Sequence, residues 1–144
     1  MADKRIPHSR KGVAAFRRDI PFTENDFSFI GRGELGGKAS GLADIKKRLE
    51  SIAPEITPEE MRISIPPLTV ITTSFFSRFM EMNNLYERIS EDISDDKLAH
   101  HFQQGELPAE LTGDLRALIS SVNSPLAIRS SSLLEDRLDS PFAG

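Results

Sequence analysis

The chain of 144 residues is 38% apolar and 28% charged, which suits one ordinary soluble domain and excludes a wholly disordered chain. It has no cysteine, which excludes a disulfide framework, a thiolate zinc site and a cysteine nucleophile. The formal net charge of −4 is unevenly spread, because residues 1–18 hold six Lys and Arg residues against one acid.

The N-terminal segment, residues 1–26, shows no clear periodicity, and we expect it to be irregular and separate from a domain over residues 27–144. Its positive charge could attract an anionic partner. No aromatic platform is interleaved with these charges, so a nucleic-acid partner is disfavoured and a solvated tail is preferred. No apolar run approaches the roughly 20 residues that cross a bilayer, so we expect no membrane contact and a cytoplasmic location.

A short strand, a glycine-rich turn and a helix come next in the chain. The alternation in Phe27–Ile30 predicts the strand, and the turn covers residues 31–37. Apolar residues at helical spacing predict a helix over about residues 37–52 that ends before Pro54. The apolar residues of that helix are Leu42, Ile45, Leu49 and Ile52.

Two extended segments are predicted at residues 62–65 and 68–72, on either side of a pair of prolines. Thr73 or Ser74 is then expected to cap a helix with an aromatic face. The residues of that face are Phe75, Phe76, Phe79 and Met80, which we interpret as core residues.

The remaining elements are two helical regions and a strand. Residues 84–104 favour an interrupted helix, and Pro108 favours the start of a cleaner one. The apolar stripe of the latter comprises Leu111, Leu115, Leu118, Ile119 and Val122. Leu126–Ile128 predicts a short buried strand that leads into Arg129. Because strands and helices are mixed along the chain, we expect an α+β (mixed α/β) fold.

The first candidate site is the turn and helix start around Lys38. Glycines let the backbone approach a ligand closely, and a helix N-terminus offers N–H groups and a positive dipole end to an anion. Gly31, Gly33 and Gly36 also fit the dinucleotide-binding pattern G-x-G-x-x-G, which is weak alone. A P-loop is disfavoured because Arg32 replaces its first glycine and no hydroxyl residue follows Lys38. A plain tight turn is the remaining alternative.

The second candidate site is Arg129 with the serines that follow it. A guanidinium at the end of a buried strand needs an anion, and its planar fork suits phosphate oxygens. An internal ion pair with Glu135 or Asp136 explains the same residue equally well. A third segment, residues 140–144, could be a plain turn.

Several segments together resemble the phosphoenolpyruvate synthase and pyruvate phosphate dikinase family. Gly36-Gly-Lys-Ala-Ser-Gly-Leu42 is similar to the start of its nucleotide-binding domain, and Ile71-Thr-Thr73 with Asn83-Asn-Leu85 to its next segment. Leu126-Ala-Ile-Arg-Ser-Ser-Ser-Leu-Leu-Glu-Asp136 and Phe142-Ala-Gly144 resemble its [VI]-R-S-S-x-x-x-E-D…F-A-G signature. The chain departs from the family at Leu133 and Leu134, where a small residue is usual.

The resemblance implies the N-terminal portion of an ATP-grasp domain, with ATP as ligand. It implies that Lys38 and Arg129 contact phosphates and that Gly144 lies in a loop that closes over the nucleotide. The full set of implied nucleotide-binding residues is Gly36, Gly37, Lys38, Arg129, Ser130 and Gly144. Magnesium ligands, a phosphohistidine domain and a pyruvate- or phosphoenolpyruvate-binding domain would lie beyond Gly144, so no metal ligand is assigned within this chain.

The implied parent protein transfers phosphate from ATP to a catalytic histidine and then to pyruvate. We expect this chain alone to be an inactive, truncated fragment whose exposed apolar surface favours self-association. One alternative function is a non-catalytic nucleotide or metabolite sensor. The others are a dinucleotide-binding domain and a purely structural fragment.

Overall fold

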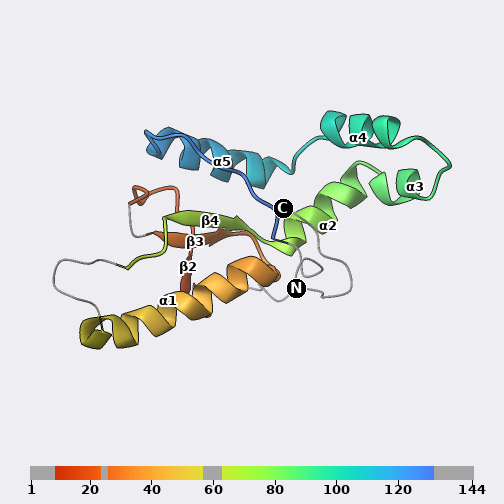
Figure 1. Cartoon of the computed structure of the whole chain (residues 1–144). Coiled ribbons are helices and arrows are strands. Elements are labelled where there is room, and N and C mark those ends of the chain that lie inside the picture. Colours follow the sequence, from red (N-terminus) through yellow and green to blue (C-terminus); the bar gives the residue numbers. More distant parts are fainter. Residues whose placement is uncertain (1–8, 24–25, 57–62, 132–144) are drawn as a thin grey trace, which may run out of the picture.

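A small sheet with helices on both sides forms the body of the protein, and three helices extend from it (Figure 1). The computed structural model describes residues 9–23, 26–56 and 63–131. Helix α1 (Gly37–Ile56) lies along one face of the sheet, and α5 (Ala109–Ser121) lies on the opposite side. This arrangement is the mixed α+β fold expected from the sequence.

The sheet contains four strands in the order β1-β2-β3-β4: Ser9–Arg10, Val13–Ala15, Phe27–Ile30 and Leu68–Ile71. Strands β2, β3 and β4 are parallel neighbours, and β1 is antiparallel to β2. The predictions of strands at 27–30 and 68–72 are confirmed. The strand predicted at 62–65 is wrong for residues 63–65, which form none, and residue 62 lies outside the described residues.

The expectation that residues 1–26 are irregular is wrong for β1 and β2. Lys11 and Gly12 both have positive φ, 49° and 81°, and turn the chain tightly between these strands. Strands of two and three residues are too short to produce a readable alternation. Residues 1–8 lie outside the described part of the chain.

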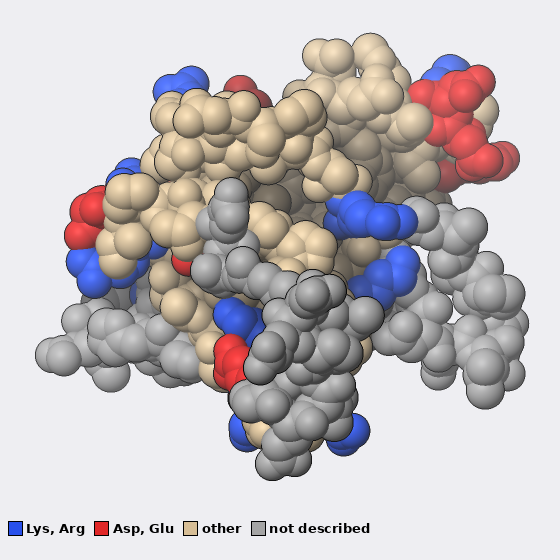
Figure 2. Space-filling view, turned by 60° about the vertical axis from the view of Figure 1, so that its left-hand side comes forward, with Lys and Arg blue, Asp and Glu red and all other residues tan. Residues whose placement is uncertain are grey.

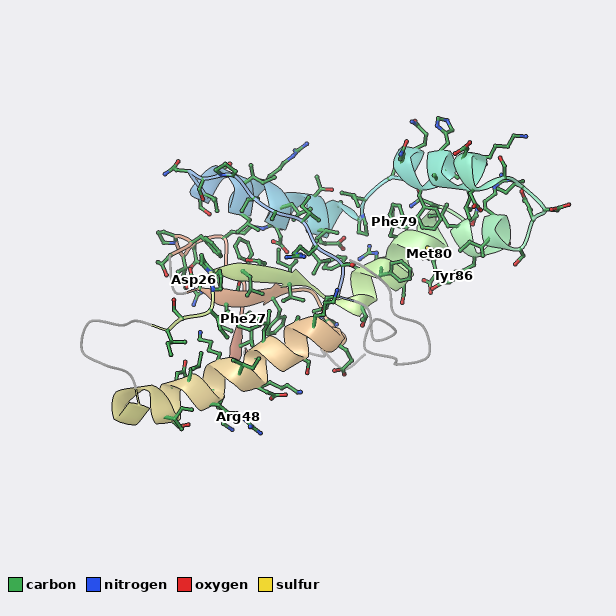
Figure 3. The ribbon with its side chains drawn as sticks, in the orientation of Figure 1. Asp26, Phe27, Arg48, Phe79, Met80 and Tyr86 are labelled. Atoms are coloured by element: carbon green, nitrogen blue, oxygen red, sulfur yellow. The ribbon has the colours of Figure 1, made fainter. Side chains whose placement is uncertain are left out.

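The core lies between the sheet and α1, where Figure 3 shows Phe27. Its buried residues are Val13, Phe27, Phe29, Leu35, Ala39, Ala43 and Val70. Helix α1 therefore packs through its alanines, whereas three residues of its predicted apolar stripe, Leu42, Ile45 and Ile52, are exposed. The small side chains allow the helix to lie close to the sheet, so a face other than the most apolar one is buried.

Helix α1 also continues to Ile56, past its predicted end before Pro54. A proline in the last turn removes one hydrogen bond, but its fixed φ of about −65° remains compatible with a helix. Within the described residues, no helix is long and apolar enough to cross a membrane.

Helices α2 (Thr73–Met82), α3 (Leu85–Ile89) and α4 (Asp95–Gln104) form the extension seen in Figure 1. The interrupted helix expected over 84–104 is confirmed. Of the aromatic face predicted for α2, Met80 is buried but Phe76 is 59% exposed. Figure 3 shows Phe79 between α2 and α4, where its ring centroid lies 6.2 Å from that of Phe102.

Helix α5 follows Pro108, as predicted, and two ion pairs tie it to the rest of the molecule. Arg18 Nε donates to Asp114 Oδ1 at 2.6 Å, and Arg78 Nη1 donates to Glu110 Oε1 at 3.0 Å. The backbone N–H of Glu110 and the Arg78 guanidinium both lower the pKa of the Glu110 carboxyl. Of the predicted stripe, Leu111 and Leu118 are buried whereas Ile119 is exposed.

The buried strand predicted at Leu126–Ile128 is wrong. Residues 122–131 form neither helix nor strand, and the Ile128 side chain is 98% exposed. A strand needs a neighbour for its backbone hydrogen bonds, and this segment instead runs back from the end of α5 towards the start of α1 (Figure 1).

Candidate functional site

The glycine-rich turn of residues 31–37 joins the buried strand β3 to the start of α1. Three of its glycines have left-handed backbone conformations, with φ of 99° at Gly31, 96° at Gly33 and 82° at Gly36. L-residues with side chains rarely adopt this conformation, so glycine is required at each position. These are the same glycines that fit the G-x-G-x-x-G pattern.

Each of these glycines also touches another part of the chain. A Cβ atom on Gly31 would lie 2.5 Å from Thr72 Oγ1, and one on Gly33 would lie 2.9 Å from Thr73 Oγ1. A Cβ atom on Gly36 would lie only 1.8 Å from the carbonyl oxygen of Ser131. Packing within the chain therefore accounts for the glycine pattern, without the dinucleotide that was one alternative.

Ser131 connects the two segments that were selected from the sequence as candidate sites. Its Oγ accepts a hydrogen bond of 3.0 Å from the backbone N–H of Ala39 in the first turn of α1. The residues lie 92 positions apart in the sequence. The structure thus places the serine segment directly at the helix N-terminus, where N–H groups and the helix dipole favour an anion.

The predicted phosphate-contacting residues lie on either side of this contact. Lys38 immediately precedes Ala39, and its side chain is exposed. Arg129, which is also exposed, precedes Ser131 by two residues, so their Cα atoms are at most about 7 Å apart. Gly36 is buried under Ser131, Gly37 is the first residue of α1, and Ser130 is exposed. Gly144, Glu135 and Asp136 lie outside the described residues.

The hydroxyl residues after β4 hold the opposite side of the turn. Thr72 was not singled out from the sequence, and it is the residue that immediately precedes α2. Thr73 or Ser74 was expected to cap this helix, but Thr72 is the N-cap and both expected residues lie within the helix. Their hydroxyl oxygens instead accept hydrogen bonds from the N–H groups of Glu34 and Arg32, at 3.0 and 3.1 Å. Because residues 31 and 33 are glycines, the turn lies close enough to the start of α2 for its N–H groups to bond these hydroxyl oxygens in place of the N–H groups of the helix.

Ser131 is the contact residue that sequence reasoning did not single out among the serines. The resemblance implied Ser130 as the nucleotide-binding serine, and the pattern Arg-Ser-Ser-Ser gave no reason to prefer Ser131. The tertiary contact with Ala39 distinguishes Ser131 from Ser130. The available signal for this contact was the glycine at position 36, since glycine is the residue type that allows a positive φ and the close approach of another segment.

Metal-binding groups were sought among the same described residues. In these ranges no three His, Asp or Glu side chains come together to hold an ion. The expectation that magnesium ligands lie beyond Gly144 stays a prediction. The described site offers N–H groups, hydroxyls and the cationic side chains of Arg32, Lys38 and Arg129.

Charge is distributed unequally over the surface. Figure 2 shows the largest group of acidic side chains at the upper right of the visible face and smaller acidic patches elsewhere, whereas Lys and Arg are spread over the face. The exposed acids around α3 and α4 are Glu87, Glu91, Asp92, Asp95 and Asp96. The glycine-rich turn and its surroundings carry exposed Arg32, Lys38 and Arg129 against one exposed acid of the turn, Glu34, and this excess of positive charge favours an anionic ligand there.

Comparison with known families agrees with this geometry. The model of the pyruvate phosphate dikinase AMP/ATP-binding domain matches residues 32–144, a range that includes both segments of the site. No curated protein and no solved structure matches the chain. Since the match covers most of its length, the chain belongs to the pyruvate phosphate dikinase AMP/ATP-binding domain family.

Proposed function

We propose that this chain binds the phosphate groups of ATP between the start of α1 and the segment around Arg129. The observation that carries the proposal is the hydrogen bond from Ala39 N–H to Ser131 Oγ, because it joins the two candidate segments at a helix N-terminus. Membership of an AMP/ATP-binding family supports a nucleotide as the ligand.

Within this site, Lys38 and Arg129 would neutralise the charge on the β- and γ-phosphates. The Lys38 ammonium is a mobile point charge, whereas the Arg129 guanidinium can donate two parallel hydrogen bonds to phosphate oxygens. Gly37 would allow close approach and Ser130 would add a polar contact, whereas Gly36 would act by packing against Ser131 and so holding the two segments together. Phosphoryl transfer depends mainly on such positioning and charge neutralisation.

We further propose that the site serves a phosphotransferase that phosphorylates a catalytic histidine and then pyruvate. The family membership supports a phosphotransferase of the dikinase kind. Mg²⁺ would accompany ATP and is expected to be held by residues outside this chain. Pyruvate or phosphoenolpyruvate as a partner, a cytoplasmic location and self-association through exposed apolar residues belong to the same proposal.

Titration calorimetry with ATP and Mg²⁺ tests the site directly. We expect Lys38→Ala and Arg129→Ala each to weaken ATP binding about tenfold or more, since each removes a charge-assisted hydrogen bond. Lys47→Ala on the exposed surface of α1 and Arg116→Ala on that of α5 are matched controls and should bind as the unaltered chain does. Unchanged affinity in both site variants would show that the phosphates bind elsewhere.

A further inference from the structure

Three consecutive hydroxyl residues contact the glycine-rich turn: Thr72, which joins β4 to α2, and Thr73 and Ser74, the first two residues of α2. We call them the hydroxyl triplet. They lie about forty residues from the turn in the sequence, with bonded pairs separated by 39 to 42 positions. None of the three has been given a role in the proposed phosphate site.

Thr73 is joined to Glu34 by two hydrogen bonds. Its Oγ1 accepts from the Glu34 N–H at 3.0 Å, and its own N–H donates to the Glu34 carbonyl oxygen at 3.1 Å. The backbone N–H and carbonyl group of Glu34 are therefore both satisfied by Thr73. A pair of bonds of this kind fixes the orientation of the turn as well as its distance from β4.

Thr72 and Ser74 enclose Arg32 in the same way. The Arg32 N–H donates to Ser74 Oγ, which lies 3.2 Å from Thr72 Oγ1. Thr72 Oγ1 in turn is within hydrogen-bond distance of the Arg32 carbonyl oxygen. Thr72 Oγ1 also lies 3.1 Å from the Ile30 carbonyl oxygen, and its single proton can serve only one of these acceptors at a time. Thr72 is only 1% exposed, so its hydroxyl is shielded from water, whereas the Arg32–Ser74 bond lies at the exposed surface.

The glycines of the turn fit the triplet at close range. A Cβ atom on Gly31 would lie 2.6 Å from the Phe75 ring as well as 2.5 Å from Thr72 Oγ1. One on Gly33 would lie 3.0 Å from the Ser74 backbone nitrogen. The absence of side chains at both glycines therefore lets the turn reach the triplet.

We propose that the hydroxyl triplet positions the glycine-rich turn for phosphate binding, with Thr73 as its main positioning residue. The inference rests on the proposed function. The triplet bonds residues 30–34, whereas the phosphates would contact residues 36–39. The triplet would therefore influence phosphate binding indirectly, by fixing the backbone of the turn that precedes the site. A turn fixed at Arg32 and Glu34 presents the first N–H groups of α1 in one orientation, which reduces the entropy cost of binding an anion.

Replacing Thr73 by valine tests this role, because valine keeps the shape of the side chain and removes its oxygen. Affinities for ATP and for AMP are measured by titration calorimetry, together with the hydrogen-exchange rate of the Glu34 amide. We expect Thr73→Val to weaken ATP binding about fivefold to tenfold, the range allowed by one lost hydrogen bond, and AMP binding less. The Glu34 amide should exchange faster, and Thr73→Ser should restore both properties.

Thr69→Val is the matched control, because it removes a β4 hydroxyl that bonds Ser28 at 2.9 Å, away from the turn. It should leave ATP affinity unchanged. Ser74→Ala offers a second variant, which should expose the Arg32 amide and weaken ATP binding in the same direction.

Three results would overturn the positioning role while leaving the proposed function intact. They are unaltered ATP affinity in Thr73→Val and Ser74→Ala, failure of Thr73→Ser to restore binding, and equal losses for ATP and AMP. A chain that binds no ATP before any substitution would refute the proposed function itself, and the positioning role with it.

Discussion

Gly36 is the residue at which the two halves of the proposed phosphate site meet. It is buried, its φ is 82°, and its missing side chain leaves the space filled by the Ser131 carbonyl group. The sequence identified Gly36, Lys38 and Arg129 as candidates from their chemistry and from the resemblance to a known family. It did not identify the contact with Ser131, because a pairing across more than ninety residues depends on how the whole chain folds.

Gly36→Ala should therefore damage both stability and binding. The left-handed backbone costs a residue with a Cβ atom about 1–2 kcal/mol, and the new methyl group would displace the backbone of Ser131. We expect urea unfolding to show a lower free energy and calorimetry to show weaker ATP binding. Gly41→Ala in α1 is the control, since a Cβ atom there meets nothing within 4 Å. Equal behaviour of the two variants would contradict the proposed contact.

At the scale of elements, the sequence predicted the helices and the four-residue strands β3 and β4, but not the shorter strands β1 and β2. Helices α2 and α5 were predicted because several turns of apolar spacing outweigh local exceptions. Strands β1 and β2 were missed because they are too short to alternate. The expected strand at Leu126–Ile128 was wrong because local propensity does not supply a neighbouring strand. In α1, the alanines that face the sheet were less conspicuous than the exposed apolar stripe.

Helix α5 contains a glycine whose explanation lies in another element. A Cβ atom on Gly113 would lie 2.7 Å from Arg18 Nη2, because the guanidinium that pairs with Asp114 lies against this position. Alanine in a helix interior normally gains about 1 kcal/mol over glycine. The exposed ion pair that it would disturb contributes up to about 1 kcal/mol.

A double-mutant cycle measured by urea unfolding separates these two effects. We expect Gly113→Ala to be nearly neutral in the unaltered chain and to stabilise the Arg18→Ala variant by about 1 kcal/mol. The difference between the effects of Gly113→Ala in the two backgrounds is the free energy of unfolding that the chain loses when a methyl group at position 113 disturbs Arg18. The same stabilisation in both backgrounds would mean that the guanidinium moves aside without cost.

At the scale of the whole molecule, the site lies where the sheet, α1 and the segment after α5 come together (Figure 1). The acidic residues around α3 and α4 lie at the far end of the extension, away from the start of α1. This separation of charge would direct a nucleoside triphosphate towards the turn. The attraction should weaken at higher salt concentration, because salt screens the charges. Composition alone did not predict it, because the net charge of −4 describes the sum and not its distribution.

The most direct test of the central claim is an amide nitrogen–proton NMR titration of the ¹⁵N-labelled chain with ATP and Mg²⁺. If the two segments form one phosphate site, the largest shift changes should occur together at residues 36–40 and 129–131, with a single dissociation constant. Adenosine, which lacks phosphates, should leave these amides largely unchanged. Shift changes confined to one of the two segments, or present equally with adenosine, would contradict the account.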